Sequence, residues 1–284
     1  MNNVKLDNID TSFESYQQLI NLYSECKNIY FSDIEIEISK WFAANLSSPL
    51  GGVVDKLVNN LNDIKFKTEY SIERILKKNN FLSHFGYDKI NDSNNTTIEY
   101  LKLKPSDSRY FHEYIINELI NRKELPEMSN ELNKKISESI FEIFTNAQIH
   151  SQSDFIYVCG QFFPAKHKIE FTITDMGIGF KNIINNRFKK GLSSTQAIDW
   201  AINDGNSTKK NVTGGIGLAI LKEFIIENKG KFQIISDDGF YQLSNNHEEK
   251  KLFKNKFPGT IINMQFRTND RNSYSSIDVI NDLF

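Results

Sequence analysis

The sequence predicts a mixed α/β (α+β) protein, with a C-terminal two-layer α/β sandwich and a smaller N-terminal α/β unit. Its 284 residues exceed the roughly 100 to 200 residues of one ordinary domain. The hydrophobic fraction of 39% with 12% aromatic residues is sufficient for a sizeable core. Apolar residues recur every three or four positions in some segments and alternate in others, which indicates both helices and strands.

In the N-terminal part, helical and extended patterns follow one another over short distances. Residues 11–26 predict the first helix, because Thr11-Ser12-Phe13-Glu14 has the Ser/Thr-x-x-Glu capping pattern before apolar residues at helical spacing. The polar and glycine-rich residues 45–52 predict a loop. The remaining expected elements are strands at 28–38 and 96–103 and helices at 53–62, 71–79 and 108–122.

These patterns divide the chain into four expected parts. A small α/β domain spans residues 1–105, ending before Pro105, and a helical connector spans 106–128. A larger domain spans 129–267 and a tail spans 268–284. The basic stretch at 250–256 follows two glutamates, so we expect a solvated loop there.

Residues 129–150 predict one long helix. Its apolar stripe is Ile136, Ile140, Ile143, Phe144 and Ala147. Glu138, Glu142, Asn146 and His150 recur every four residues and form a polar row on an adjacent face. A solvent-facing helix surface would show the same row, so the row alone does not indicate function.

The next informative segment is a strand at 168–175 that ends in Asp175-Met176-Gly177-Ile178-Gly179. Turns use glycine for backbone reasons, so Gly-x-Gly after a strand is weak evidence when taken alone. The dinucleotide-binding fingerprint fits worse, because no third glycine opens a helix.

A second glycine-rich segment, Gly214-Gly215-Ile216-Gly217-Leu218, leads into a helix that a glycine ends at position 230. Such an entry directs free backbone N–H groups and the positive end of the helix dipole at an anion, and phosphate is the obvious one. Strands are expected at 231–236 and 259–266.

With these segments in order, residues 125–267 resemble the GHKL superfamily of ATP-binding domains, which have the Bergerat fold and include gyrase, MutL, histidine kinases and anti-sigma-factor serine kinases. Residues 142–147, with Glu142 and Asn146, look like the family's N box. Residues 175–179 look like its G1 box, 214–218 like its G2 box, and Phe257-Pro258-Gly259-Thr260 like its final Gly-Thr strand.

The resemblance implies a role for each matching residue. Asp175 would accept a hydrogen bond from the adenine amino group, supported by Thr260 through water. Asn146 would offer its amide oxygen to Mg²⁺, which prefers oxygen ligands. Gly177 and Gly179 would let the backbone pass close to the base and sugar. The implied phosphate-binding residues are Gly214, Gly215, Gly217 and Leu218.

Glu142 is the most discriminating position, because histidine kinases of this family usually carry Asn there. The gyrase/MutL branch and the serine kinases carry Glu, a general base for water or for a serine hydroxyl. Residues 181–212 would form the ATP lid, with a short helix at 196–203 and Lys209 as a γ-phosphate contact. An ordinary surface lysine would look the same.

Two departures from the family narrow the expected activity. Only residues 268–284 follow the last strand, so the catalytic lysine that gyrase and MutL take from a following domain is not expected here. His112 lacks the Glu-Leu-Arg-x-Pro context of a phospho-accepting histidine, so autophosphorylation on histidine is not expected.

The N-terminal part resembles STAS domains more weakly. The order strand, Ser47-Ser48-Pro49-Leu50-Gly51-Gly52, helix is similar to the loop that carries the serine phosphorylated by anti-sigma kinases. The aspartate that normally lies just upstream is replaced by Asn45 or Leu46. A simple turn capping a helix at Val53 would also explain the segment.

The expected function is therefore Mg-ATP binding with slow hydrolysis, in which lid closure is coupled to docking of a protein partner or of the N-terminal domain. A protein partner or self-association as a homodimer is expected as well. Two alternatives stay open: a serine/threonine kinase acting on a STAS-like domain, and an ATP-sensing interaction module without turnover. The net charge of −2 argues against nucleic acid. Two separated cysteines and the lack of a signal peptide or membrane span favour the cytoplasm.

Overall fold

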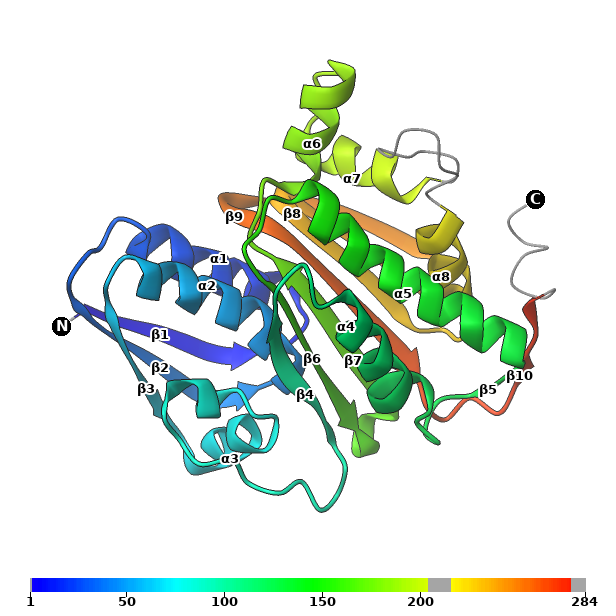
Figure 1. Ribbon diagram of the computed structural model, residues 1–284, viewed down its shortest axis with the longest axis horizontal. Helices are drawn as coiled ribbons and strands as arrows, with labels where there is room; N and C mark the ends of the chain where they lie inside the picture. Colours follow the sequence, from blue (N-terminus) through cyan, green and yellow to red (C-terminus); the bar gives the residue numbers. More distant parts are fainter. Residues whose placement is uncertain (1, 204–215, 277–284) are drawn as a thin grey trace.

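The computed structural model describes residues 2–203 and 216–276, which form a mixed α/β structure with several sheets (Figure 1). The N-terminal unit begins with a parallel sheet in the order β1-β2-β3, of Asn2–Ile9, Asp33–Phe42 and Asp63–Thr68. Helix α1 (Phe13–Cys26) connects the first two strands and α2 (Ser47–Asn59) the last two. Then follow α3 (Tyr70–Lys78) and the short 3-10 helix η2 (Leu82–Phe85).

The larger sheet has the order β4-β6-β7-β9-β8 and is antiparallel throughout. Its strands are Thr97–Leu103, Ile156–Phe163, Lys168–Asp175, His247–Arg267 and Lys231–Ser244. Helices α4 (Ser108–Ile115), α5 (Asn130–His150) and α8 (Ile216–Glu227) cover one face (Figure 1). The short strands β5 (Glu127–Met128) and β10 (Ser273–Tyr274) pair beside the start of α5.

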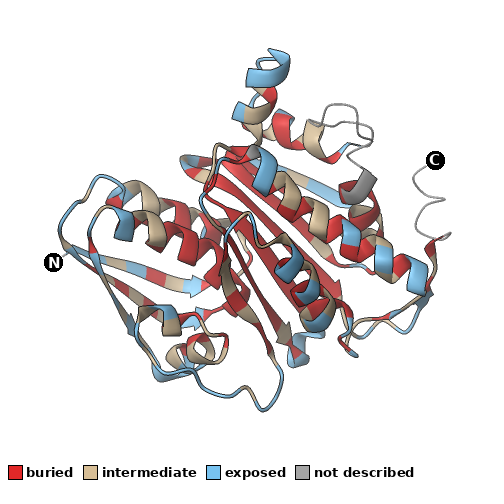
Figure 2. Cartoon of the chain, in the orientation of Figure 1, coloured by how far each residue is buried: buried red, intermediate tan, exposed pale blue. Residues whose placement is uncertain are grey.

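The other face of the large sheet is covered by α1 and α2, which also pack on the small parallel sheet. Strand β7 explains this arrangement, because its residues alternate between the two faces. Ile169, Phe171 and Ile173 join the core under α4, α5 and α8. Glu170, Thr172 and Thr174 are equally buried but point the other way. Figure 2 shows the sheet buried along most of its length.

The polar face of β7 is matched by polar side chains of the N-terminal unit. The Asn45 amide donates to Thr172 Oγ1 at 3.0 Å and to Asn263 Oδ1 at 3.1 Å. Ser48 Oγ donates to the carbonyl of Tyr157 at 2.9 Å and forms a second hydrogen bond with the Thr174 hydroxyl at 2.8 Å. Buried polar groups need such partners, so the two surfaces are complementary.

Several expected elements are confirmed: the helices at 11–26, 71–79 and 129–150 and the strands at 96–103 and 168–175. Within the described residues, no helix is both long and apolar enough to cross a bilayer.

The expected loop at 45–52 is wrong, because these residues form the 3-10 helix η1 (Ala44–Leu46) and the start of α2. The two glycines serve close packing instead of a turn. A Cβ atom on Gly51 would lie 2.2 Å from the Tyr100 hydroxyl, and one on Gly52 would lie 2.6 Å from Met176 Sδ. The glycines therefore let α2 approach the large sheet.

The expected loop at 250–256 is also wrong, since these residues continue β9 and pair with β8 up to Ser244 and His247. Asn245 and Asn246 both have positive φ and form the tight turn of this hairpin. The strand expected at 28–38 is shifted to β2, and the helix expected at 108–122 is α4 followed by a π-helical segment at Ile116–Ile120.

The sequence placed the strand at 96–103 inside the N-terminal domain, whereas β4 hydrogen-bonds to β6 as an edge strand of the large sheet. Both faces of β4 are buried, with Ile98 and Leu103 in one core and Tyr100 in the other. Helix α4 is not a free connector either, because Phe111 stacks on Phe144 of α5 with ring centres 4.3 Å apart.

Candidate functional site

Helix α5 carries the first two candidate residues. Ser129 caps its N-terminus by accepting a hydrogen bond from the N–H of Leu132, and its apolar stripe packs on the large sheet. Glu142 and Asn146 lie one turn apart on the flank of this stripe, and both are half-buried. These two members of the predicted polar row are thus held at the rim of the core by the burial of their apolar neighbours, whereas Glu138 is exposed.

Asp175 is the last residue of β7 and is only 7% exposed. It lies opposite Ile156 on one side and Thr260 on the other. Its Oδ1 accepts a hydrogen bond from the N–H of Gly177 at 2.9 Å. Burial raises the pKa of Asp175 to about 7, although hydrogen bonds from the Gly177 N–H and from Thr260 act in the opposite direction.

The turn after Asp175 packs its backbone against neighbouring backbone so closely that Gly177 in the turn and Gly259 on β9 cannot carry a side chain. A Cβ atom on Gly177 would lie 1.9 Å from the carbonyl oxygen of Ser151, the residue after α5. That carbonyl accepts the N–H of Ile178 at 2.9 Å. Gly259 has φ +116, and a Cβ there would lie 2.0 Å from the Asp175 carbonyl. The end of α5, the end of β7 and β9 are therefore fixed relative to one another.

Ser236 on β8 completes this junction, and sequence reasoning missed it. Its hydroxyl accepts the N–H of Phe180 at 2.9 Å and lies 3.2 Å from the Thr260 hydroxyl. Gly179 has φ +69, and a Cβ atom on it would lie only 2.9 Å from the Ser236 hydroxyl oxygen. The only signal in the sequence was its position at the end of the strand expected at 231–236.

The segment after the turn forms α6 (Gly179–Phe188) and α7 (Ser194–Ile202), so the helix expected at 196–203 is confirmed with a slightly earlier start. Ser193 and Gln196 form a capping box at the start of α7. The Phe188 and Trp200 rings lie 5.1 Å apart and join the two helices. Figure 1 shows this pair standing beyond the ends of β8 and α5.

The structure accounts for only part of the predicted phosphate-binding segment. Lys209, Gly214 and Gly215 lie outside the described residues. Gly217 belongs to the first turn of α8, and Leu218 beside it is 6% exposed and belongs to the core. The Leu218 side chain thus has a packing role, and α8 lies against α5 on the same face of the sheet.

The described residues therefore bring two groups to one end of the sheet. Asp175, the last residue of β7, pairs with Thr260 inside β9, while Glu142 and Asn146 lie on the last turns of α5. The hydrogen bond from Ile178 to Ser151 links the groups, and Asn146 lies about 8 Å along the helix axis from Ser151. Among residues 2–203 and 216–276, no group of three His, Cys, Asp or Glu is arranged to hold a metal ion.

Comparison with known proteins does not place the chain in a family. No protein-family model matches the chain, and no curated protein sequence matches it.

Proposed function

We propose that this chain binds Mg-ATP in a GHKL-type site over residues 129–267 and hydrolyses it slowly, with lid closure over the nucleotide coupled to docking of a protein partner or of a second copy. The observation that carries the proposal is Asp175: a carboxylate at a strand end, 7% exposed and beside Thr260. Among residues 2–203 and 216–276, no cation pairs with this carboxylate; burying an unpaired carboxylate is costly, and such groups concentrate at functional sites.

Adenine recognition follows from the acceptor character of an ionised carboxylate. One Asp175 oxygen is occupied by the Gly177 N–H, and the carboxylate has further acceptor capacity for the adenine amino group. Guanine has a carbonyl in place of that amino group and would meet an acceptor with an acceptor. The site is therefore expected to favour ATP over GTP.

At the phosphate end, the proposal uses α5 and the start of α8. The Asn146 amide oxygen would bind Mg²⁺ together with phosphate and water oxygens. Glu142, one turn earlier, would act as general base for the attacking water. The glycine-rich residues before α8, a helix of 12 residues, would direct N–H groups at the phosphates.

The architecture is compatible with the Bergerat fold, in which helices cover one face of a sheet and the nucleotide lies between a helix and strand ends. Here α5 and α8 lie on one face of an antiparallel sheet, and Asp175 ends β7 beside Thr260 of the neighbouring strand β9. We assign the N-terminal unit as STAS-like on its order of a strand, Ser47-Ser48 and a helix.

The structure disfavours one form of the kinase alternative, phosphorylation of the chain's own Ser47 or Ser48. Both residues are fully buried against the large sheet, and the Ser48 hydroxyl is hydrogen-bonded to neighbours on β6 and β7. A phosphoryl group there would place about two negative charges in a site that holds no cation partner for them among the described contacts. A kinase acting on a separate protein remains the alternative.

Incubation with γ-labelled ATP and Mg²⁺ separates these activities. Release of labelled phosphate, lost in Glu142→Gln and in Asp175→Asn, supports the proposed ATPase. Label transferred to protein would support the kinase, and ATP that is bound but not converted would support a sensing module. If neither ATP nor ADP binds, the proposal is wrong.

A further inference from the structure

A second polar site lies between the N-terminal unit and the large sheet, away from the residues proposed to bind ATP. It is a pocket of about 300 Å³. The N-terminal unit contributes the β1–α1 connection and the end of β2, while β6, β7, β8 and the 3-10 helix η4 (Pro164–Lys166) between β6 and β7 form the rest. The lining residues that matter here are Asp10, Trp41, Lys166, Lys168, Glu170 and Lys231.

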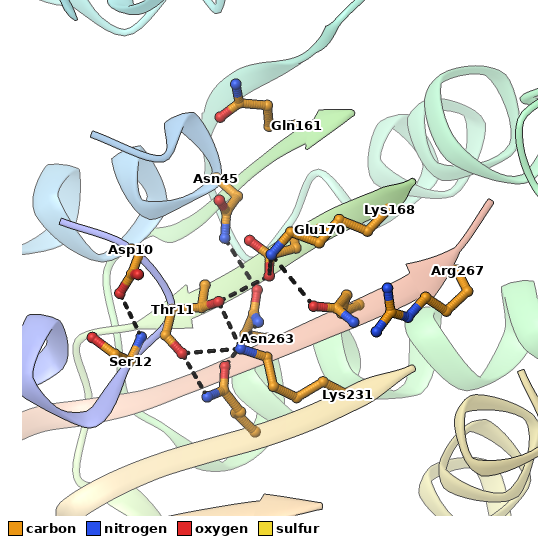
Figure 3. Close-up of polar contacts among 12 residues, drawn as sticks. Asp10, Thr11, Ser12, Asn45, Gln161, Lys168, Glu170, Lys231, Asn263 and Arg267 are labelled. Carbon is orange, nitrogen blue, oxygen red and sulfur yellow. Dashed lines mark hydrogen bonds and ion pairs between the residues drawn. The ribbon is translucent and has the colours of Figure 1, made fainter. Parts of the chain in front are cut away.

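The floor of this pocket is a charged network in which the carboxylate is almost fully buried and the two lysines are half-buried (Figure 3). Glu170 is 1% exposed, and its Oε1 accepts hydrogen bonds from Lys168 Nζ and from the Thr11 hydroxyl, both at 2.8 Å. Lys231 Nζ donates to Thr11 Oγ1 at 2.8 Å and to the Thr11 carbonyl at 3.0 Å. Burying such charges costs more than an apolar contact would, so docking of the two units alone does not require them.

The charges of the pocket do not cancel. Three ammonium groups, of Lys166, Lys168 and Lys231, line it together with two carboxylates. One of these carboxylates, Asp10, is engaged at the start of α1, where it accepts the Ser12 N–H and the Ser15 hydroxyl, each at 3.0 Å. The pocket therefore carries an excess of positive charge.

The mouth of the pocket combines a cation with an aromatic wall. Lys166 is exposed, and its Nζ lies 5.3 Å from the Trp41 ring centre and 5.9 Å from that of Phe163. Lys168 Nζ lies 5.1 Å from the Phe163 ring. Within the described ranges, Lys166 makes no ion pair with a carboxylate. Its charge is thus available to a ligand, while the rings hold it near the pocket.

We propose that this pocket binds a small anion bearing carboxylate or phosphate groups, held by Lys166 and Lys168 above the buried Glu170–Lys231 floor. Its volume is at the lower end of the range of about 300 to 1,000 Å³ for ligand pockets, which suits a small metabolite. Because both units line the pocket, the bound anion stabilises their docking by mass action. This inference does not depend on ATP binding.

The test is the fluorescence of Trp41 in a Trp200→Phe background, because the chain has two tryptophans. Citrate and inorganic phosphate are titrated separately at constant ionic strength, with sodium chloride as the reference. We expect a saturable signal change with at least one of them. Saturation by citrate alone assigns a carboxylate ligand, and saturation by phosphate alone assigns a phosphoryl ligand.

Three variants decide whether the pocket is responsible. Lys168→Met and Lys166→Met should each weaken binding by about tenfold or more, as expected when a charged hydrogen-bond donor is lost. Lys254→Met, an exposed lysine on β9 outside the pocket, should leave binding unchanged. Lys166 is exposed, so its substitution keeps the protein folded even if Lys168→Met does not. The absence of saturation for both anions, or equal affinity in Lys166→Met and Lys254→Met, would overturn the proposal.

If phosphate bound instead at the phosphate end of the proposed nucleotide site, Asn146→Ala would change the titration and Lys166→Met would not. That outcome also contradicts the pocket proposal and leaves the proposed function standing. Conversely, anion binding that needs Lys166 supports the pocket even in a protein that binds no ATP.

Discussion

The burial of Asp175 leads to a prediction about stability that needs no ligand. Its folded-state pKa of about 7 lies far above its ordinary value of 3.8, so the folded protein holds this proton more tightly than the unfolded chain. Ionisation of the buried Asp175 therefore lowers the free energy of unfolding. This loss of stability is absent below about pH 4 and fully present above about pH 7. At 1.36 kcal/mol per tenfold change in proton affinity, it approaches about 4 kcal/mol at pH 8.

Asp175→Asn removes that cost and keeps an oxygen for the Gly177 N–H. We therefore expect this variant to be more stable than the wild type at pH 8, and the difference should shrink by about 2 to 3 kcal/mol on going to pH 5. Urea unfolding at several pH values measures it. The same variant should lose ATP binding, which is the pattern of a residue kept for function at the expense of stability.

Asp92 provides a control of opposite sign. Burial alone would raise its pKa, but hydrogen bonds from Lys78 and Thr97 lower the pKa to about 2. Its ionised form is thus stabilising above pH 4, so Asp92→Asn should destabilise the protein equally at pH 5 and pH 8. If Asp175→Asn is destabilising at pH 8, or if its effect does not vary with pH, the reasoning about Asp175 is wrong.

Four further predictions follow from the site and its surroundings. The affinity for Mg-ATP, measured by calorimetry, should fall about tenfold from pH 8 to pH 6, because the ionised fraction of Asp175 falls with a pKa of about 7. An affinity that does not change with pH would exclude this carboxylate as the adenine acceptor. Glu142→Gln should keep nucleotide affinity and lower phosphate release at least about 100-fold, whereas equal loss of both would make Glu142 structural. Gly177→Ala should destabilise the protein by more than about 3 kcal/mol, because the added Cβ meets the Ser151 carbonyl. The control Gly191→Ala should cost about 1 kcal/mol, because Gly191 has φ +67 but no heavy atom within 4 Å of an added Cβ. Similar unfolding midpoints for the two variants would contradict the packing role of Gly177. Ser48→Ala should cost about 1 to 2 kcal/mol and Ser48→Asp at least about 3 kcal/mol in urea unfolding, and tolerance of Asp would mean that α2 undocks readily.

The elements that the sequence predicted best are those with a strong local pattern. Helix α5 has a long apolar stripe and a serine cap, and β7 alternates over eight residues. Strands β1 and β3 were missed, because few of their residues are apolar and charged residues separate them. Strand β6 was missed for a different reason, since it is apolar on both faces and has no clear period.

Long-range pairing could not be predicted from local patterns. Nothing near residues 97–103 indicates that β4 pairs with β6 instead of with the N-terminal strands. Gly51 and Gly52 suggested a turn, because a glycine that makes room for Tyr100 or Met176 looks the same in sequence as a glycine in a loop. The pocket lined by Lys166, Lys168 and Lys231 likewise depends on how two units dock.

The residues of the candidate site stay a prediction from the family resemblance, and the contacts that join them could not be predicted from the sequence. The family resemblance implied Asp175, Thr260, Glu142 and Asn146, and in the structure the first two are paired across β7 and β9. It did not predict Ser236, which joins Thr260 to the start of α6. That contact arises from strand register, which short motifs do not encode.

The most direct test of the central claim is a calorimetric titration of Mg-ATP and Mg-GTP into the wild-type protein and Asp175→Asn at pH 8. Our account predicts binding of ATP to the wild type, much weaker binding of GTP, and loss of ATP binding in a variant that is folded and more stable. ATP binding of equal strength in both proteins, or no binding by the wild type, would contradict it.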